Sequence, residues 1–461
     1  MTTRVTTRET SEARRVRRAD LLAAAAGALL VALAVVVGTV IQHATGNLRV
    51  NWPPLYASWF PHLGPGTPAA FAVAVLVIAY GPPLAARLPW RGLVLAGWPA
   101  AMAWTWSLAL IDGFRTGIAG RLTTEYEYLT VIRRFDHLGP ALRDFTQHIL
   151  LHHGPDSWPA HIAGHPPAAV LTFVGLDRIG LGGGAWAGIW CITLGTSAVA
   201  AALITLRALT DEPTARRAAP FLVLAPAAVW VGTSADGYFA AVAAWALAFL
   251  TPAATRTTRA PAAAALTAGL LFGLTCYLSY GLTLIALIAA AILLVTRSVR
   301  PLPLVLAGTA AVAAVFTLAG FSWWEGYRLL VERYYQGVAA VRPYAYWVWG
   351  NLACTVVITG LATVAGLRHV LAAAPPALRR LRHSGTAADD RLVVLVLAAL
   401  AALLAADLSG MSKAETERIW LPFALWLLPA AALLPAAHRR HWLTAQAVLA
   451  LLINHLLYTG W

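Results

Sequence analysis

Long uninterrupted apolar runs recur along this 461-residue chain and constrain its fold more than any other feature. The run from Leu21 to Ile41 has no charged residue, and similar runs follow at short intervals. A helix crosses a bilayer with about 20 apolar residues, so such runs are long enough to span. Only 12% of the residues are charged, whereas soluble domains carry about 25%. The sequence therefore predicts an all-α polytopic membrane protein, because disorder needs low hydrophobicity and a barrel needs alternating residues.

The spacing of the fourteen runs predicts about 13 transmembrane helices, to within one or two. The runs lie near 21–41, 69–86, 93–111, 168–181, 185–206, 218–233, 237–252, 262–280, 282–296, 302–321, 346–367, 391–408, 419–436 and 442–458. We expect residues 1–20 to be a polar cytoplasmic tail and residues 21–461 to form a single transmembrane domain. The first run is too long for a cleaved signal peptide, whose apolar core has about 7–15 residues.

The net charge of +14 is explained by topology rather than by a nucleic-acid partner. Arginines gather in short loops near 87–91, 297–300, 368–391 and 439–440, which is typical of cytoplasmic loops. This places the N-terminus in the cytoplasm of a multi-pass plasma (inner) membrane protein, with external loops at 42–68, 112–167, 322–345 and 409–418. Arg207, Arg216 and Arg217 also indicate a cytoplasmic loop. That requires an odd number of crossings between 168 and 206, so either 168–181 does not cross fully or this loop breaks the rule.

The large external loop, residues 112–167, is the only long polar stretch between the predicted spans. Long loops between packed elements are usually functional or disordered, and this one keeps apolar residues at helical spacing. We expect two amphipathic helices, roughly 124–135 and 140–152, to lie in the external membrane interface. The three cysteines of the chain all fall inside apolar runs, which is not the pattern of a disulfide framework or a zinc site.

Two glutamates of this loop, Glu125 and Glu127, are candidate general bases. A carboxylate at the membrane interface with apolar neighbours is placed to take a proton from an acceptor hydroxyl. The alternative is structural: Thr124 and Glu127 fit a capping box, and acidic residues are favoured in a helix's first turn.

Histidines in the same loop allow a candidate divalent-metal site. Asp144, His148 and His152 recur every four residues and would share one helix face. His161 or His165 could supply the further ligand that such a site needs. The alternative is a polar face that meets water and headgroups. His165 precedes two prolines, which fit the first turn of a transmembrane helix and leave the histidine at its mouth.

Further polar residues lie at other external span ends. Asp236 interrupts two apolar runs and is either a functional carboxylate or the N-cap of the next helix. In loop 322–345, Tyr334 and Arg342 belong either to an interfacial aromatic belt or to a surface for sugar stacking and phosphate binding.

The segment 409–418 is short and rich in charge, and holds the only lysine of the chain, Lys413. It also contains Glu415, Glu417 and Arg418, and the arginine precedes an apolar run on the predicted external face. Arginine suits bidentate phosphate contact, so these four residues are candidates for substrate binding. The alternative is a solvated helix start with acids in its first turn.

These pieces together resemble the GT-C superfamily of membrane glycosyltransferases. The resemblance lies in the acidic large loop with Glu125 or Glu127, in His165-Pro166-Pro167 and in Asp236. The run Lys413–Pro422 is similar to the Glu-x-Glu-Arg-(aromatic)-x-x-Pro segment of actinobacterial relatives, and scarce lysine with abundant alanine fits a GC-rich actinobacterial genome. A glutamate stands where the family usually has a catalytic aspartate, and two spans rather than one separate the tail helix from the loop.

The resemblance implies transfer of a mannosyl- or arabinofuranosyl-type sugar from a polyprenyl-phosphate donor to a cell-envelope glycan, lipid or protein. The catalytic residues would be Glu125, Glu127 and Asp236. The substrate-binding residues would be His165, Tyr334, Arg342, Lys413, Glu415, Glu417 and Arg418. No cofactor is implied beyond the candidate metal, and membrane lipids are the other partners. A transporter or flippase remains open, but it should place ionisable residues near the membrane midplane and show paired halves. A non-catalytic scaffold is the third class.

Overall fold

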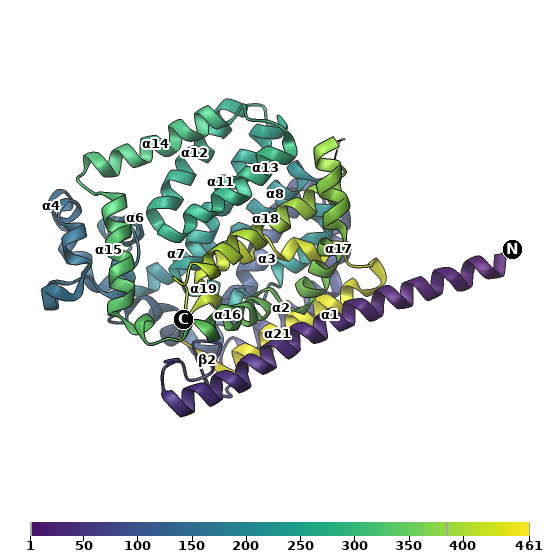
Figure 1. Ribbon diagram of the computed structural model, residues 1–461, viewed down its shortest axis with the longest axis horizontal. Helices are drawn as coiled ribbons and strands as arrows, with labels where there is room; N and C mark the ends of the chain where they lie inside the picture. The colour runs from purple at the N-terminus through teal and green to yellow at the C-terminus, as the bar shows by residue number, and fades with distance from the viewer. Residues whose placement is uncertain (1, 384–385, 461) are drawn as a thin grey trace.

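The computed structural model describes residues 2–383 and 386–460, which fold into one helical bundle with a two-stranded ribbon (Figure 1). The helices of the first half are α1 (Thr2–Thr45), α2 (Thr67–Arg87), α3 (Trp90–Ala109), α4 (Leu138–Arg143), α5 (Ala160–Ala163), α6 (Ala168–Arg178), α7 (Gly184–Thr196), α8 (Ala198–Leu209), α9 (Glu212–Val223), α10 (Ala228–Val231) and α11 (Ala235–Thr255). Those of the second half are α12 (Pro261–Leu278), α13 (Ile285–Thr296), α14 (Leu302–Leu318), α15 (Trp323–Gln336), α16 (Tyr344–Thr359), α17 (Leu361–His383), α18 (Ala388–Leu408), α19 (Thr416–Ile419), α20 (Leu421–Ala424) and α21 (Arg439–Leu456). The strands are β1 (Ala57–Trp59) and β2 (Leu457–Thr459).

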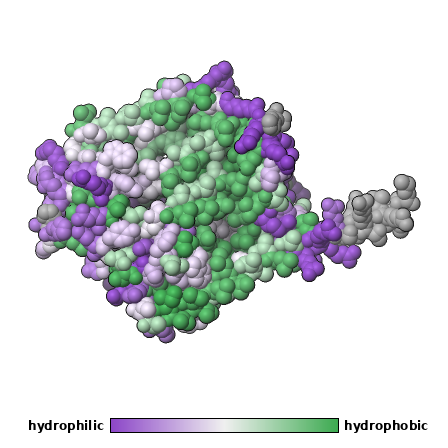
Figure 2. Space-filling view, viewed as in Figure 1, coloured by the Kyte–Doolittle hydropathy of each residue, from purple (hydrophilic) through white to green (hydrophobic). Residues whose placement is uncertain are grey.

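The all-α polytopic class is confirmed. Among the described residues, eight helices are long and apolar enough to cross a bilayer, or up to ten with the two sharply bent helix pairs. Large apolar side chains such as Val36, Leu95 and Leu318 are exposed on the outside of the bundle, where hydrophobic residues form an extensive surface (Figure 2). Such a surface suits lipid rather than water. The expected number of about 13 spans is not confirmed.

The segment 168–181 does not form a full span. Helix α6 has 11 residues, which is about 16 Å of helix against a hydrocarbon core of about 30 Å. It ends before Gly180 and Gly183, both with positive φ, which turn the chain before the next helix. Helices α7 and α8 together then form one apolar segment, Gly184–Leu209. One crossing thus separates the large loop from Arg207, which removes the conflict in the loop charges.

The first helix, α1, begins within the polar segment predicted as a tail and continues without a break into the first apolar run. Its Asp20 is 1% exposed and forms ion pairs with Arg368 at 2.6 Å and His369 at 2.9 Å, both on α17. These pairs join α1 to the C-terminal half of the bundle at one end.

The large loop folds into short helical turns rather than the two continuous helices expected at 124–135 and 140–152. They are the 3-10 segments Tyr128–Phe135, Phe145–His148 and Leu151–Asp156 together with α4. Some of the apolar side chains are buried within the protein instead, because Phe135 and Phe145 pack on Trp158 with ring centroids 5.5 and 5.3 Å apart. Pro140 and the positive-φ Gly154 disfavour a longer helix through this region.

Helix α11 is buried along most of its length and carries the candidate site at its first turn. Nearly half of its residues are alanine or glycine, so α7, α8 and α12 can approach it closely. At its N-terminal end, Gly195 of α7 faces Gly237, where an added methyl group would meet backbone atoms at 3.1 Å. This close packing fixes the start of α11.

The two strands join parts of the chain that are far apart in sequence. They pair antiparallel, with Ala57 opposite Thr459 and Trp59 opposite Leu457. The ribbon therefore connects the segment after α1 with the segment after α21, at the same end of the bundle as α19 (Figure 1).

Candidate active site

Arg418 is the centre of a buried polar cluster formed by three distant segments. Its Nη1 donates to Oδ2 of Asp236 at 2.6 Å, and its Nη2 lies 2.8 Å from Oε2 of Glu415. The same Nη2 lies 3.1 Å from Nε2 of His161. Arg418 is 6% exposed, so the guanidinium is removed from water and held by these side chains. The sequence-predicted residues Asp236, Glu415 and Arg418 are thus brought together.

Local backbone conformation directs these side chains toward one another. Ala414 and Glu415 adopt left-handed φ angles of 72° and 61°, after which the short helix α19 begins. Non-glycine residues rarely adopt such angles, so this turn is locally unfavourable and must be held by its surroundings. Glu415 and Arg418, three residues apart, then face each other.

Asp236 is the second residue of α11 rather than its N-cap, which is Ser234. The helix-capping interpretation of Asp236 is therefore wrong. Its carboxylate is 8% exposed and is directed at Arg418, from a helical first turn that favours negative charge.

Glu127 joins the cluster through His161. Oε1 of Glu127 lies 2.8 Å from Nδ1 of His161, and the glutamate side chain is 3% exposed. Because a guanidinium nitrogen can only donate, Nε2 of His161 accepts from Arg418, and Nδ1 carries the proton that is donated to Glu127. The chain Glu127–His161–Arg418–Asp236 is then continuous in hydrogen bonds.

The capping-box interpretation of Thr124 and Glu127 is wrong. Glu127 has an extended backbone just before a 3-10 segment, and Thr124 is exposed. Glu125, the alternative base, is also exposed, and its main partner is Tyr126, whose pKa its hydrogen bond and negative charge raise. The structure thus separates the two glutamates, with only Glu127 in the cluster.

His165 lies behind His161 as a second layer. Its Nδ1 is 2.7 Å from the carbonyl oxygen of His161 and 3.2 Å from the hydroxyl of Tyr128. Burial lowers the pKa of His165 to about 4, so the ring is neutral near pH 7. Its contacts hold the turn that carries His161.

A second group, the loop-holding group, consists of Tyr334, Arg342 and Lys413. Arg342 donates from Nε to the carbonyl of Leu48 at 3.1 Å and from Nη1 to that of Lys413 at 2.8 Å. The backbone N–H of Lys413 donates to the hydroxyl of Tyr334 at 3.0 Å, and its Nζ donates to the carbonyl of Ala339. These three residues attach segment 409–418 to loop 322–345.

The loop-holding group touches the cluster at one point, where Nη1 of Arg342 lies 3.4 Å from Oε1 of Glu415. Burial acts to raise the pKa of Glu415, but the charges of Arg418 and Arg342 outweigh it and hold that pKa below its usual value. Burial likewise acts to lower the pKa of Arg418, and the carboxylates of Asp236 and Glu415 raise it by more. Both groups are therefore charged at neutral pH.

Glu417 is directed away from the cluster. It is fully buried, and its Oε1 accepts a hydrogen bond from the backbone N–H of Tyr56 at 2.8 Å. Burial raises the pKa of Glu417 to about 7. Of the predicted site residues, Glu417 thus contacts the segment next to β1 rather than Arg418.

The expected metal triad does not form. Asp144 and His152 are exposed, and the nearest carboxylate to His152 is that of Glu332 at 3.8 Å. No group of three or more His, Cys, Asp or Glu side chains suited to a metal ion occurs within the described residues. The helix face that would have aligned Asp144, His148 and His152 is broken, because these residues lie in separate short turns.

No protein-family model matches this chain, and no curated protein matches it. Among solved structures, it is similar to the oligosaccharyltransferase of Archaeoglobus fulgidus in its apo form, with a TM-score of 0.50 and 14% identity. The match covers 80% of this chain and 56% of that protein, so the chain spans little more than half its length. Over most of its own length, this chain therefore shares the fold of that solved structure.

The same archaeal protein, solved with an inhibitory peptide and a dolichol-phosphate, is less similar, at a TM-score of 0.43 and 13% identity over 74% of this chain and 50% of that one. At these identities the likeness describes the fold alone. The chemistry that this chain can perform depends on its own residues, and these gather in the cluster around Arg418.

Proposed function

We propose that this protein is a membrane glycosyltransferase that moves a sugar of mannosyl or arabinofuranosyl type from a polyprenyl phosphate to a cell-envelope glycan, lipid or protein on the external face. The observation that carries the proposal is the convergence of Glu127, His161, Asp236 and Arg418 in one buried cluster. The GT-C fold supports this class, because its similar solved structure is an oligosaccharyltransferase.

The Glu127–His161 pair serves as the base in this proposal. Glu127 holds the imidazole in one tautomer, in which the unprotonated Nε2 accepts from Arg418. When the donor phosphate draws the guanidinium away, this nitrogen can take the proton of an acceptor hydroxyl. The carboxylate then stabilises the imidazolium that forms. His161 is the residue that sequence reasoning missed as a base.

Arg418 stabilises the leaving phosphate. As the acceptor oxygen bonds to the anomeric carbon, the bond from that carbon to the phosphate oxygen breaks, and the phosphate carries away the bonding electrons. A guanidinium matches the resulting charge in bidentate geometry. Since Asp236 and Glu415 hold Arg418 in the present structure, donor binding must share its donors between these carboxylates and the phosphate. This single displacement inverts the anomeric configuration.

A transporter is not proposed. It should place ionisable groups near the middle of the membrane, whereas Asp236 lies in the first turn of α11 and Arg418 in the connection between α18 and α20. The cluster therefore sits at the ends of the helices.

The test is sugar transfer by the purified protein in nanodiscs, with radiolabelled polyprenyl-phosphate mannose and polyprenyl-phosphate arabinofuranose as alternative donors and a cell-envelope extract as acceptor. We expect Glu127→Gln and His161→Ala each to lose about a hundredfold or more of the rate with one donor, as is typical for a base. Glu125→Gln is the matched control two residues away. Wild-type protein that transfers neither sugar, or a fully active Glu127→Gln variant, would refute the proposal.

A further inference from the structure

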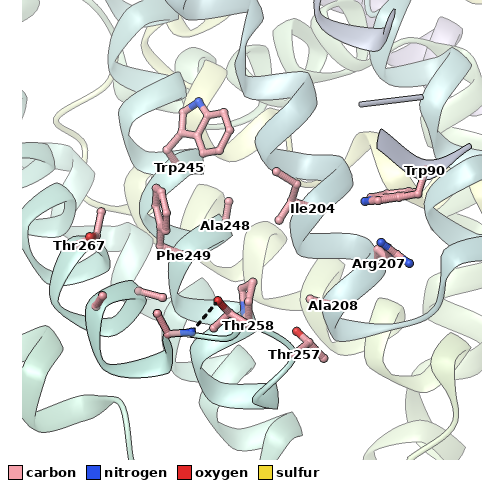
Figure 3. A pocket seen from close by; sticks show the side chains of 14 residues that line it. Trp90, Ile204, Arg207, Ala208, Trp245, Ala248, Phe249, Thr257, Thr258 and Thr267 are labelled. Atoms are coloured by element: carbon pink, nitrogen blue, oxygen red, sulfur yellow. Dashed lines mark hydrogen bonds between the residues drawn. The ribbon is translucent and has the colours of Figure 1, made fainter. Parts of the chain in front are cut away.

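An open cavity of about 650 Å³ lies between α8 and α12, with α11 as its floor (Figure 3). Trp245 and Phe249 of α11 lie on one side of it, and Arg207 of α8 and Trp90 at the start of α3 lie on the other (Figure 3). The connection between α11 and α12, with Thr257 and Thr258, closes one end. We call this cavity the α8–α12 groove.

Small side chains on α12 and its approach create the groove. Its wall includes Ala260, Ala263, Ala264 and Thr267, which recur at the spacing of one helix face. Helices α8 and α12 both pack on α11, but these short side chains leave the space between them unfilled. The cavity therefore results from the small residues of α12 and not from the conformation of one side chain.

The rim of the groove is basic. The guanidinium of Arg207 lies over the ring of Trp90 at 4.6 Å and pairs with Glu212 at 2.9 Å, and Glu212 is also bound by Arg216. Arg256 and Arg259 flank Thr257 and Thr258, are exposed, and form no ion pair within the described residues. Positive charge therefore exceeds negative charge at this rim.

The interior of the groove is apolar. Its lining runs along α11 from Pro252 back to Trp245, about 10 Å of helix toward the middle of the bundle. Beside it, α12 exposes Leu266 and Leu270 on the outside of the bundle. An apolar channel that starts at a basic rim with a tryptophan, Trp90, matches the boundary between headgroups and acyl chains.

The α8–α12 groove is separate from the candidate active site. Asp236 lies at the first turn of α11 and Pro252 near its last, about 24 Å apart along the helix. The two sites therefore lie at opposite ends of the same helix.

We propose that the α8–α12 groove binds one anionic phospholipid of the surrounding leaflet. Its phosphodiester lies at Arg207 and the Arg256–Ala260 connection, and the first part of one acyl chain lies against Phe249 and Trp245. The excess of arginine at the rim selects a headgroup with net negative charge over a zwitterionic one.

The test is native mass spectrometry of the full chain titrated with dioleoyl phosphatidylglycerol, with dioleoyl phosphatidylcholine and with inorganic phosphate. We expect one tight phosphatidylglycerol adduct, bound at least about tenfold more tightly than phosphatidylcholine, since one charge-assisted contact gives a difference of this size. Arg207→Gln should weaken the adduct about as much, and Ala264→Phe should remove it by filling the groove. Arg300→Gln, in the connection from α13 to α14, is the control arginine and should leave the adduct unchanged.

Equal binding of the two phospholipids, or an adduct unaffected by both Arg207→Gln and Ala264→Phe, would overturn the proposal. Displacement of phosphatidylglycerol by inorganic phosphate would overturn it in favour of a simple anion site. Displacement by polyprenyl phosphate at equal concentration would overturn it in favour of the carrier lipid. Ala264→Phe counts only if its thermal unfolding is unchanged, and Arg207→Gln provides the result otherwise.

Discussion

Two buried arginines flank Glu415 but are held in different ways. Arg418 is bound by the side chains of Asp236, Glu415 and His161. Arg342 is bound mainly by the backbone carbonyls of Leu48 and Lys413, and touches Glu415 at 3.4 Å. Both are less than a tenth exposed.

The two arginines differ in whether their hydrogen-bond partners can be replaced by a phosphate. Side-chain partners can rotate away when a phosphate competes for the guanidinium, whereas backbone carbonyls cannot leave without unfolding their segment. We therefore expect Arg418 to take part in chemistry and Arg342 to hold the loop that presents it. The sequence alone treated the two as equivalent phosphate-binding candidates.

Replacing Arg418 tests the catalytic half of this comparison and should give the largest effect. Arg418→Gln should lower transfer about a thousandfold or more, because the leaving phosphate loses its cation. It should also destabilise the fold by about 3–5 kcal/mol, because Asp236 is left buried without its partner. Transfer assays and thermal unfolding measure the two effects.

The double variant Arg418→Gln with Asp236→Asn separates these effects. Neutralising Asp236 should restore much of the lost stability but none of the activity. Recovery of transfer in the double variant would contradict the catalytic assignment.

Replacing Arg342 tests the structural half. Arg342→Gln should destabilise the fold by about 2–4 kcal/mol through lost charge-assisted hydrogen bonds to buried carbonyls. Transfer measured well below the unfolding temperature should fall less than about tenfold, since Arg418 is retained. A loss as large as that of Arg418→Gln, with unchanged unfolding temperature, would reverse the two roles.

Glu417 is a buried carboxylate that, like Arg342, is held by a backbone group, here the N–H of Tyr56. Its pKa is raised from 4.5 to about 7, so the folded state holds its proton more tightly than the unfolded state does. Below about pH 4.5 the carboxyl group of Glu417 is protonated in both states and does not destabilise the fold. The free energy of unfolding then falls as the pH rises from about 4.5 to about 7. Glu417→Gln should thus stabilise the fold by up to about 3 kcal/mol at pH 8 and by little at pH 5.

Unfolding temperatures of wild type and Glu417→Gln across pH 5–8 measure this effect. A gap between the two that is constant with pH would show that Glu417 has an ordinary pKa in the folded protein.

Glu125 should show the smallest effect. Because it is exposed and outside the cluster, Glu125→Gln should change the transfer rate less than about twofold and the stability by less than about 0.5 kcal/mol. Measuring the transfer rates of Glu125→Gln and Glu127→Gln side by side compares an exposed and a buried glutamate in one short segment. A larger loss of transfer in Glu125→Gln than in Glu127→Gln would identify Glu125 as the base.

Much of the fold could be predicted from the sequence, because membrane spans depend on local composition. The long polar loop 112–167 with its apolar positions followed from hydropathy and spacing, and loop charge already raised doubt about 168–181 as a full span. The turns of loop 112–167 did not follow, since Gly154 and the packing around Trp158 override helical periodicity.

The site was less accessible to sequence reasoning. Asp236 and Arg418 were singled out because charge is rare at span ends, and in the structure their side chains lie 2.6 Å apart. His161 was not found as their partner, because 257 residues separate it from Arg418 and no spacing rule connects them. Its position four residues before His165, just ahead of a proline-started helix, was the available signal.

The ribbon of β1 and β2 sets an order for assembly. Residues 57 and 459 pair across the whole intervening chain, and Tyr56, next to this pair, holds Glu417 in the segment that presents Arg418. During synthesis β1 is made early, but it can pair with β2 only after the helices between them have been made. The segment that presents Arg418 can therefore reach its final arrangement only after α21 is in place and β2 has paired with β1.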